Sequence, residues 1–215
     1  MKVKICGLTT LEDALAAVEA GADLLGFNFY PKSPRCLAPE ACRAITAGLR
    51  RAGADVVTVG VFVNAGLEEI TAILDSCSLD LAQLHGDEPP ELLAQLGSRA
   101  FKALRPDGSE ALEALRKTYP PRADAPAYLV DAFQAGSYGG TGRTGDWLLA
   151  GALAAGHPIL LAGGLTSENV AAAVKQVHPW GVDTASGVET SPGRKDRLKM
   201  EAFIRVAKNL PKELG

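Results

Sequence analysis

Residues 57–84, VTVGVFVNAGLEEITAILDSCSLDLAQL, contain two short apolar runs separated by a segment with helical spacing. The runs Val57–Phe62 and Leu81–Leu84 are built mainly from β-branched and aliphatic residues, as buried strands are. Between them, residues 67–76 repeat apolar side chains at intervals of three and four, which is typical of a helix that packs one face on a sheet. The stretch therefore predicts two parallel strands joined by a helix.

The same alternation extends in both directions along the chain. Strands are predicted at Val3–Cys6, Leu24–Asn28, Val57–Phe62, Leu81–Leu84, Phe101–Leu104, Ala127–Asp131, Pro158–Ala162 and Val182–Ala185. Helices are predicted at Leu11–Glu19, Pro39–Arg50, Leu67–Ser76, Pro89–Leu96, Ser109–Lys117, Trp147–Ala154, Ser167–Val177 and Arg197–Asn209. An open, doubly wound sheet would also use such units, but strict alternation without an unpaired edge strand favours a closed α/β barrel, the (β/α)8 TIM barrel. We expect a single domain over residues 1–215, since no low-complexity linker divides the chain.

Several predicted helices have recognisable N-terminal residues. Thr10, with Asp13 three positions later, and Ser167, with Asn169 nearby, are expected to cap the helices that follow them. Pro39 and Pro89 suit the first turns of the helices that contain them.

Composition and charge narrow the classes of function. Lys and Arg number 22 against 25 Asp and Glu, so the net charge of −3 argues against a nucleic-acid surface or a polybasic membrane patch. The segment MKVKICGL lacks the apolar run of a secretory signal, and no stretch approaches the roughly 20 apolar residues of a membrane span. We expect a cytoplasmic protein with four free thiols, since its cysteines show no CxxC spacing.

Function in a barrel of this kind gathers at the C-terminal ends of the strands and in the loops that follow them. Polar residues and glycines dominate those positions: Cys6-Gly7, Asn28 with residues 30–35, Val63-Asn64, residues 83–86, Arg105, Asp131, Gly163-Gly164 and Ser186-Gly187. These residues are the candidates for a binding or catalytic site.

A glycine-rich loop follows the sixth predicted strand. Gly140, Gly142 and Gly145 have the GxGxxG spacing of a dinucleotide site. The run begins well after the strand, and no acidic residue stands about 20 positions further on to hold a ribose. We interpret the loop as part of an active site, with Gly142 as a candidate substrate contact.

The turns after the seventh and eighth strands indicate a phosphate site. Gly163-Gly164 and Ser186-Gly187 stand where such barrels commonly bind phosphate, and glycines let backbone N–H groups approach the oxygens. A short helix starting near Gly187 would point its positive end at the phosphate. The alternative is that these glycines only form tight turns.

Seven segments together resemble the phosphoribosylanthranilate isomerase family nearly end to end. They are residues 3–9, 26–35, 59–64, 83–86, 139–144, 163–165 and 182–189. The resemblance implies an Amadori rearrangement of the phosphorylated sugar derivative N-(5′-phosphoribosyl)anthranilate to 1-(2-carboxyphenylamino)-1-deoxyribulose 5-phosphate in tryptophan biosynthesis, without a cofactor. By resemblance, Cys6 is the general base, Asp131 the general acid and Arg35 the residue that holds the anthranilate carboxylate. His85 is a secondary candidate for substrate contact.

The chemistry gives these roles a physical reason. Opening the sugar ring needs a proton on the ring oxygen, so Asp131 must hold a proton near neutral pH, through burial or nearby phosphate charge. A base must then remove the proton on C2. Cys6 acts only as a thiolate, so we expect a cationic or helix-end environment to lower its pKa. Lys4 lies two positions earlier and is expected on the same side of the strand.

Two other functions stay open at this point. The isomerase of histidine biosynthesis performs the same rearrangement on a substrate with two phosphates, but an aspartate would then close the first strand, where Cys6 stands. A catalytically inert barrel that binds a phosphorylated metabolite or a partner protein is the other alternative. The sequence leaves monomer and homodimer equally open.

Overall fold

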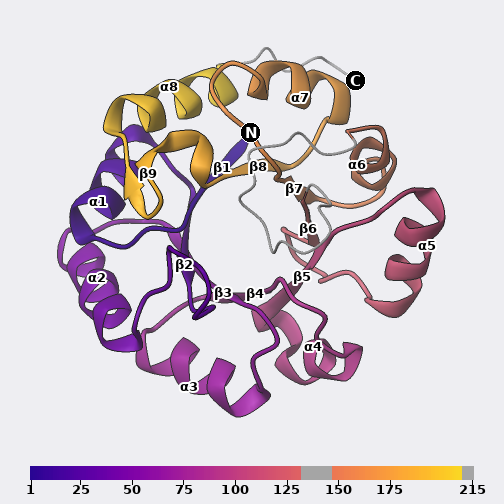
Figure 1. The fold of residues 1–215 in the computed structure, drawn as a ribbon, viewed down its shortest axis with the longest axis horizontal. Helices are drawn as coiled ribbons and strands as arrows, with labels where there is room; N and C mark the ends of the chain where they lie inside the picture. Colours follow the sequence, from indigo (N-terminus) through magenta and orange to yellow (C-terminus); the bar gives the residue numbers. More distant parts are fainter. Residues whose placement is uncertain (132–146, 210–215) are drawn as a thin grey trace.

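The computed structural model describes residues 1–131 and 147–209, in which eight parallel strands close into a barrel with helices around it (Figure 1). The strands are β1 Lys2–Cys6, β2 Leu24–Asn28, β3 Val57–Phe62, β4 Leu81–Leu84, β5 Ala100–Leu104, β6 Tyr128–Val130, β7 Ile159–Leu161 and β8 Gly181–Thr184. The helices are α1 Leu11–Ala20, α2 Pro39–Arg51, α3 Leu67–Ser76, α4 Pro90–Leu96, α5 Ser109–Thr118, α6 Trp147–Ala154, α7 Val170–Val177 and α8 Arg197–Lys208. The closed barrel confirms the predicted fold.

Each strand pairs with its neighbours in chain order, and β8 pairs with β1 to close the sheet. The register at the closure aligns Lys4 with Asp183. Every predicted strand agrees with the observed one to within one residue at each end. The C-terminal ends of all eight strands therefore meet at one rim of the barrel.

Two apolar layers hold the strands in place. Alternate strand residues face the barrel interior, where they form a small cluster: Leu24, Val59, Leu81, Phe101, Ala103, Leu129, Leu160 and Ala162. The residues between them face outward and pack against the helices in a much larger cluster. This two-residue period is the reason that a strand can present a polar residue to one side while the other side stays in the core.

The helix start predicted after Thr10 matches the structure, and the one predicted at Pro89 differs from it by one residue. The Thr10 hydroxyl accepts a hydrogen bond from the backbone N–H of Asp13 at 3.1 Å, which confirms the predicted cap. Helix α4 begins at Pro90, one residue later than predicted, and Pro89 has extended backbone. A residue that precedes proline is disfavoured from helical geometry, so Pro89 ends the loop instead of opening the helix.

The predicted cap at Ser167 is wrong. Helix α7 begins at Val170, and no side chain caps it. The side chain of Asn169 accepts a hydrogen bond from Thr166 N and donates one to Gly164 O, both at 2.9 Å. Because Asn169 stabilises a turn after β7, the helix starts only after that turn.

A short hairpin after β8 was not predicted. The 3-10 helix η2, Ser186–Val188, leads into the antiparallel strands β9, Glu189–Ser191, and β10, Arg194–Lys195. Gly193 in the connecting turn has φ of +83°, a conformation that glycine adopts without steric cost. The hairpin places Glu189 and Lys195 beside the barrel rim.

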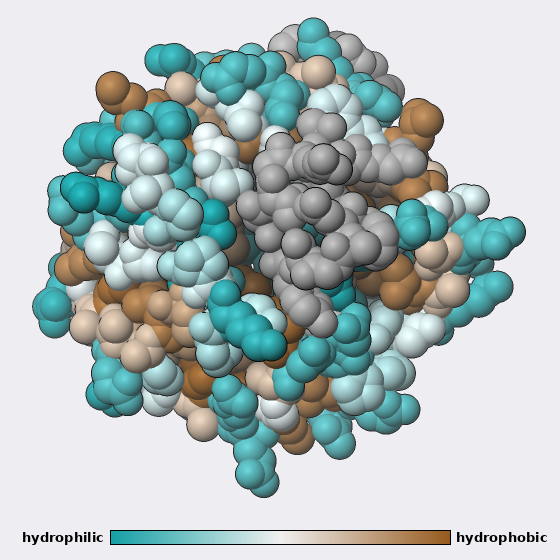
Figure 2. Space-filling view, viewed as in Figure 1, coloured by the Kyte–Doolittle hydropathy of each residue, from teal (hydrophilic) through white to brown (hydrophobic). Residues whose placement is uncertain are grey.

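The rim-side surface is predominantly hydrophilic, with hydrophobic residues in scattered groups (Figure 2). Leu148 and Leu198 are the most exposed large hydrophobic residues in the described part of the chain. Within residues 1–131 and 147–209, no helix is both long enough and apolar enough to cross a lipid bilayer.

Candidate active site

A cavity of about 350 Å³ lies at the C-terminal ends of the strands. Most of the predicted site residues line it: Cys6, Arg35, His85, Asp131, Gly163, Gly164 and Ser186. Gly187 does not line it, and Gly142 lies outside the described residues. The topology therefore brings together side chains that are far apart in the sequence.

Cys6 ends β1 and is almost fully buried at the cavity wall. Lys4 lies on the same side of the strand, near the Cys6 thiol, and its Nζ donates to Asp183 Oδ1 at 2.7 Å. A Cβ atom on Gly26 would lie only 2.7 Å from Cys6 Sγ, so glycine on the neighbouring strand makes room for the thiol. The predicted position of Lys4 beside Cys6 is confirmed.

The expected lowering of the Cys6 pKa is not found. Burial raises the pKa of the thiol above its ordinary value, and the Asp183 carboxylate acts in the same direction. The charges of Lys4 and Lys195 lower it, but not enough to outweigh burial. Cys6 is therefore a neutral thiol that has a cation beside it.

Arg35 is held by an acidic residue that sequence reasoning missed. Its Nε and Nη2 atoms donate to the two carboxylate oxygens of Glu189 at 2.8 and 2.7 Å, a bidentate ion pair. Lys195 Nζ also donates to Glu189, at 2.9 Å. Burial opposes ionisation of Glu189, but Arg35 and Lys195 hold its pKa below the ordinary value. The pair fixes the guanidinium at the cavity wall.

Gly7 allows Arg35 to take this position. Gly7 has φ of +73°, and a Cβ atom there would clash with Arg35 Cδ. Gly53 has nearly the same backbone, φ +70°, but a Cβ atom added to it would meet no described atom within 4 Å. The side chain of Arg35 therefore depends on glycine at position 7.

The two glycines provide a matched prediction. Gly7→Ala and Gly53→Ala should each lower the free energy of unfolding by about 1–2 kcal/mol, the cost of left-handed backbone at alanine. Only Gly7→Ala should also weaken ligand binding, because only its methyl group displaces Arg35. Thermal unfolding and ligand titration of both variants check this, and equal binding by the two would contradict the contact.

His85 connects the general-acid candidate to the barrel. Its Nε2 lies 3.1 Å from Asp131 Oδ2, and its Nδ1 lies 2.7 Å from Gln83 Nε2. An amide nitrogen only donates, so in this arrangement Nδ1 accepts and Nε2 carries the proton that is shared with Asp131. One Asp131 oxygen is thus bonded to His85, and the residue lines the cavity.

Gln83 is a further residue that sequence reasoning did not single out for a role. It lines the cavity, is almost completely buried, and its Oε1 has no hydrogen-bond partner among the described residues. A buried acceptor without a partner is costly, so this oxygen is suited to accept a hydrogen bond from a ligand. Gln83 lies two residues before His85 at an inward-facing strand position, and this spacing is the sequence signal by which it could have been identified.

The two glycine turns differ in their geometry. Gly163 and Gly164 have φ of +98° and +66°, so both need glycine, and both line the cavity. Helix η2 starts at Ser186, one residue before the predicted start. A Cβ atom on Gly187 would clash with Leu165 O, so this glycine serves close packing of η2 on the turn after β7. Gly163, Gly164 and Ser186 therefore line the cavity, whereas Gly187 is required for packing beside it.

No group of three or more His, Cys, Asp or Glu side chains in the described ranges is arranged to hold a metal ion. The charged groups near the cavity instead include two ion pairs, Arg35 with Glu189 and Lys4 with Asp183, and the His85 ring hydrogen-bonds to Asp131.

Comparisons with known proteins agree along the whole chain. The family model described as N-(5′-phosphoribosyl)anthranilate isomerase matches residues 3–206. A protein of that name from Pelobacter propionicus is 47% identical over 213 residues, 99% of this chain and 98% of the relative. One from Geobacter sp. strain M21 is 51% identical over 209 residues, 97% of this chain and 98% of the relative.

Solved structures give the same result. The phosphoribosyl anthranilate isomerase of Thermotoga maritima is 39% identical, with a TM-score of 0.86, and the match covers 98% of this chain and all of that one. A second structure, of an isomerase in complex with reduced 1-(o-carboxyphenylamino)-1-deoxyribulose 5-phosphate, is 39% identical with a TM-score of 0.83 and the same coverage.

Proposed function

The chain belongs to the N-(5′-phosphoribosyl)anthranilate isomerase family and is an isomerase of tryptophan biosynthesis, and we propose that Cys6 and Asp131 catalyse its Amadori rearrangement. The observation that carries this proposal is that a thiol and a carboxyl group, from β1 and from the end of β6, line one cavity. Acid–base catalysis needs both groups within reach of one substrate.

The proposed sequence of proton transfers begins at the sugar ring. Asp131 protonates the ring oxygen of the aminoaldose, the ring opens, and the nitrogen lone pair forms a C1=N Schiff base. Cys6 acts in the fraction of the enzyme in which its thiol has lost its proton to solvent, and this thiolate removes the proton from C2, which gives an enolamine. The Cys6 thiol then protonates C1 while the Asp131 carboxylate takes the C2 hydroxyl proton, so the aminoketose forms, both groups return to their starting states and the atoms balance without a co-reactant.

His85 supports the acid in this scheme. After Asp131 has given up its proton, the N–H at His85 Nε2 donates to the carboxylate and stabilises it. The substrate's phosphate is placed at the turns of Gly163, Gly164 and Ser186, where backbone N–H groups of glycine-rich turns suit its oxygens. Lys4 stabilises the Cys6 thiolate when it forms.

Arg35 is placed against the anthranilate carboxylate. Its ion pair with Glu189 uses Nε and Nη2, so the guanidinium is oriented while its remaining edge faces the ligand. Arg35→Ala should raise KM about 10- to 100-fold with a smaller change in kcat, since a hydrogen bond to a charged group contributes about 1.5–3 kcal/mol. Steady-state kinetics check this, with Arg99→Ala, which breaks only an exposed pair with Asp75, as control. An unchanged KM would remove Arg35 from the binding site.

The substrate's fluorescence provides the direct test of function. Purified protein should abolish the fluorescence of N-(5′-phosphoribosyl)anthranilate in a reaction that follows enzyme concentration. Binding without turnover would instead support an inert phosphosugar-binding barrel.

We further propose that residues 1–215 act as one (β/α)8 domain in the cytoplasm, where charged phosphosugars are retained, as a monomer or homodimer. The Thermotoga maritima isomerase has been described as dimeric, and sedimentation of this protein distinguishes the two states.

A further inference from the structure

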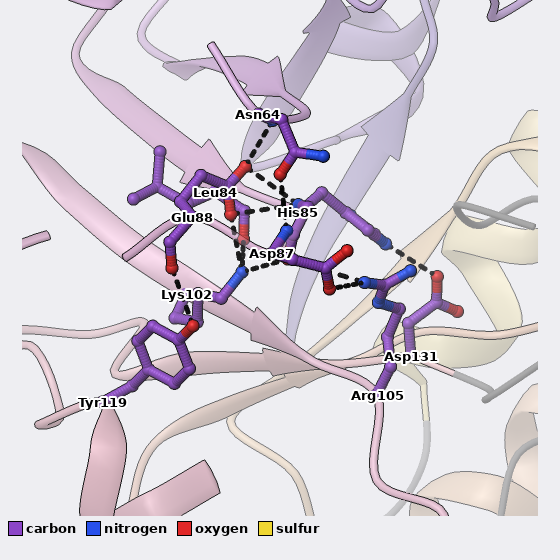
Figure 3. Close-up of polar contacts among 10 residues, drawn as sticks. Asn64, Leu84, His85, Asp87, Glu88, Lys102, Arg105, Tyr119 and Asp131 are labelled. Carbon is purple, nitrogen blue, oxygen red and sulfur yellow. Dashed lines mark hydrogen bonds and ion pairs between the residues drawn. The ribbon is translucent and has the colours of Figure 1, made fainter. Parts of the chain in front are cut away.

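We propose that a buried ion pair outside the cavity, Glu88 with Lys102, is a positioning device that holds the backbone around His85 and so sets His85 against Asp131 (Figure 3). The inference rests on the proposed function, because Asp131 is its general acid. Glu88 and Lys102 do not line the cavity and act through His85.

Lys102 binds the main chain on both sides of His85. Its Nζ donates to Leu84 O at 3.2 Å and to Gly86 O at 2.6 Å, the carbonyls of the residues that flank the histidine. The same ammonium group donates to Glu88 Oε2 at 2.7 Å. A single cation thus fixes two peptide groups in the segment that carries the imidazole.

The Glu88 carboxylate also binds the backbone near His85, through N–H groups of two different segments. Its carboxylate accepts from Gly86 N at 2.9 Å and from Asn64 N, just beyond the end of β3, at 3.0 Å. The Tyr119 hydroxyl donates to Glu88 O at 2.7 Å, which links the loop after β4, where Glu88 lies, to the segment after α5. Figure 3 shows these contacts converging on the loop from several elements of the fold.

The loop has little room for another conformation. A Cβ atom on Gly86 would clash with Asn64 Oδ1 and would lie 2.7 Å from Asn64 N and 2.8 Å from Glu88 Oε1. Asn64 itself has φ of +57° and accepts a hydrogen bond from Asp87 N at 2.7 Å. The backbone is closely packed where the His85 side chain must be placed.

The burial of the Glu88–Lys102 pair indicates that the pair positions the backbone around it more than it stabilises the fold. Lys102 lies on the face of β5 opposite to Phe101 and Ala103, which face the barrel interior, and its side chain is 2% exposed against 1% for Glu88. Burial lowers the pKa of Lys102 below its ordinary value, which reflects the cost of a charge at this place. Because apolar residues of similar size usually stabilise a core at least as well as a buried ion pair, the pair is better explained by the geometry that it imposes.

The double variant Glu88→Gln/Lys102→Met tests the proposal. It removes both charges and keeps the volume, and it avoids leaving one charge buried alone. We expect kcat to fall about 10- to 100-fold with KM nearly unchanged, as for a small misplacement of a catalytic group. In a His85→Ala background the same double substitution should change kcat by less than about twofold, since the two sites then no longer couple.

An activity-independent measurement accompanies the kinetics. Imidazole ¹⁵N spectra of the wild type should show His85 with the proton on Nε2, and the double variant should show averaged tautomers. Thr58→Val is the matched control, because it removes a buried hydroxyl at the opposite end of the barrel, where Thr58 Oγ1 bonds Asp80 at 2.7 Å. It should lower the unfolding temperature without changing kcat or the His85 signals.

The outcomes separate the two proposals. Unchanged kcat and unchanged His85 signals in the double variant would overturn the positioning role, as would an equal loss of kcat in Thr58→Val. If the wild type fails to convert N-(5′-phosphoribosyl)anthranilate, the proposed function falls, and the ¹⁵N spectra alone then decide whether the ion pair positions His85.

Discussion

Cys6→Ser is expected to reduce kcat about a thousandfold while leaving affinity for a reduced product analogue within about twofold of the wild type. General base catalysis typically contributes two to four orders of magnitude, and a serine hydroxyl is far too weak an acid to replace a thiolate. The substitution is nearly isosteric, and Lys4 and Asp183 keep their own ion pair at 2.7 Å. Binding should therefore survive the loss of chemistry.

The control for this variant is another thiol of the same chain. Cys36 is exposed and does not line the cavity, so Cys36→Ser should retain wild-type kcat. Stopped-flow fluorescence with substrate and titration with the analogue measure the two properties separately. A Cys6→Ser enzyme with more than a tenth of the wild-type kcat would exclude Cys6 as the base.

The pH dependence of the wild type follows from the buried thiol. Because burial raises the pKa of Cys6, the thiolate fraction of the free enzyme increases as the pH rises above neutrality. The value of kcat/KM should therefore increase with pH over that range, because only the thiolate can remove the C2 proton. In Cys6→Ser this ascending limb should be absent, and its persistence would assign the limb to another group.

Asp131→Asn is expected to cause the second large loss, about 100- to 10,000-fold in kcat, because an amide cannot protonate the ring oxygen. The side chain keeps its shape, and its oxygen still accepts from the N–H at His85 Nε2. Substrate whose ring is already open would bypass the missing step. The residual rate should therefore recover in part with an open-chain aminoaldose analogue.

Asp75→Asn is the matched control for this second substitution. It changes an exposed carboxylate whose ion-pair partner is Arg99, away from the cavity, and should leave kcat unchanged. Equal rates for Asp131→Asn and the wild type would show that another group supplies the proton.

The sequence was sufficient for the barrel because the decisive signals are local. Apolar runs and helical spacing recur in each unit, so every strand could be placed within one residue, and Thr10 could be identified as a cap. Ser167 does not cap a helix, because the Asn169 side chain stabilises the turn after β7 and the helix begins only after that turn. The sequence pattern does not show which of these local hydrogen bonds forms.

The partners of the site residues depend on contacts between distant segments. Arg35 was predicted, but its bidentate partner Glu189 belongs to a hairpin whose strands are only three and two residues long, too short for a periodic signal. The Lys102–Glu88 pair was missed because a lysine within an apolar strand has no periodicity that reveals its partner. Their geometry depends on tertiary packing, which single residues in a sequence do not specify.

The closure of the barrel has a consequence for protein synthesis. Cys6 lies on the first strand to leave the ribosome, but that strand pairs with β8, and Lys4 is neutralised by Asp183, 179 residues later. A nascent chain that ends before Gly181 already contains Cys6, Arg35 and Asp131, yet it lacks the strand and the carboxylate that complete their surroundings. Such long-range pairing forms late. A fragment that ends before Gly181 is therefore expected to be inactive, although it contains all three proposed site residues.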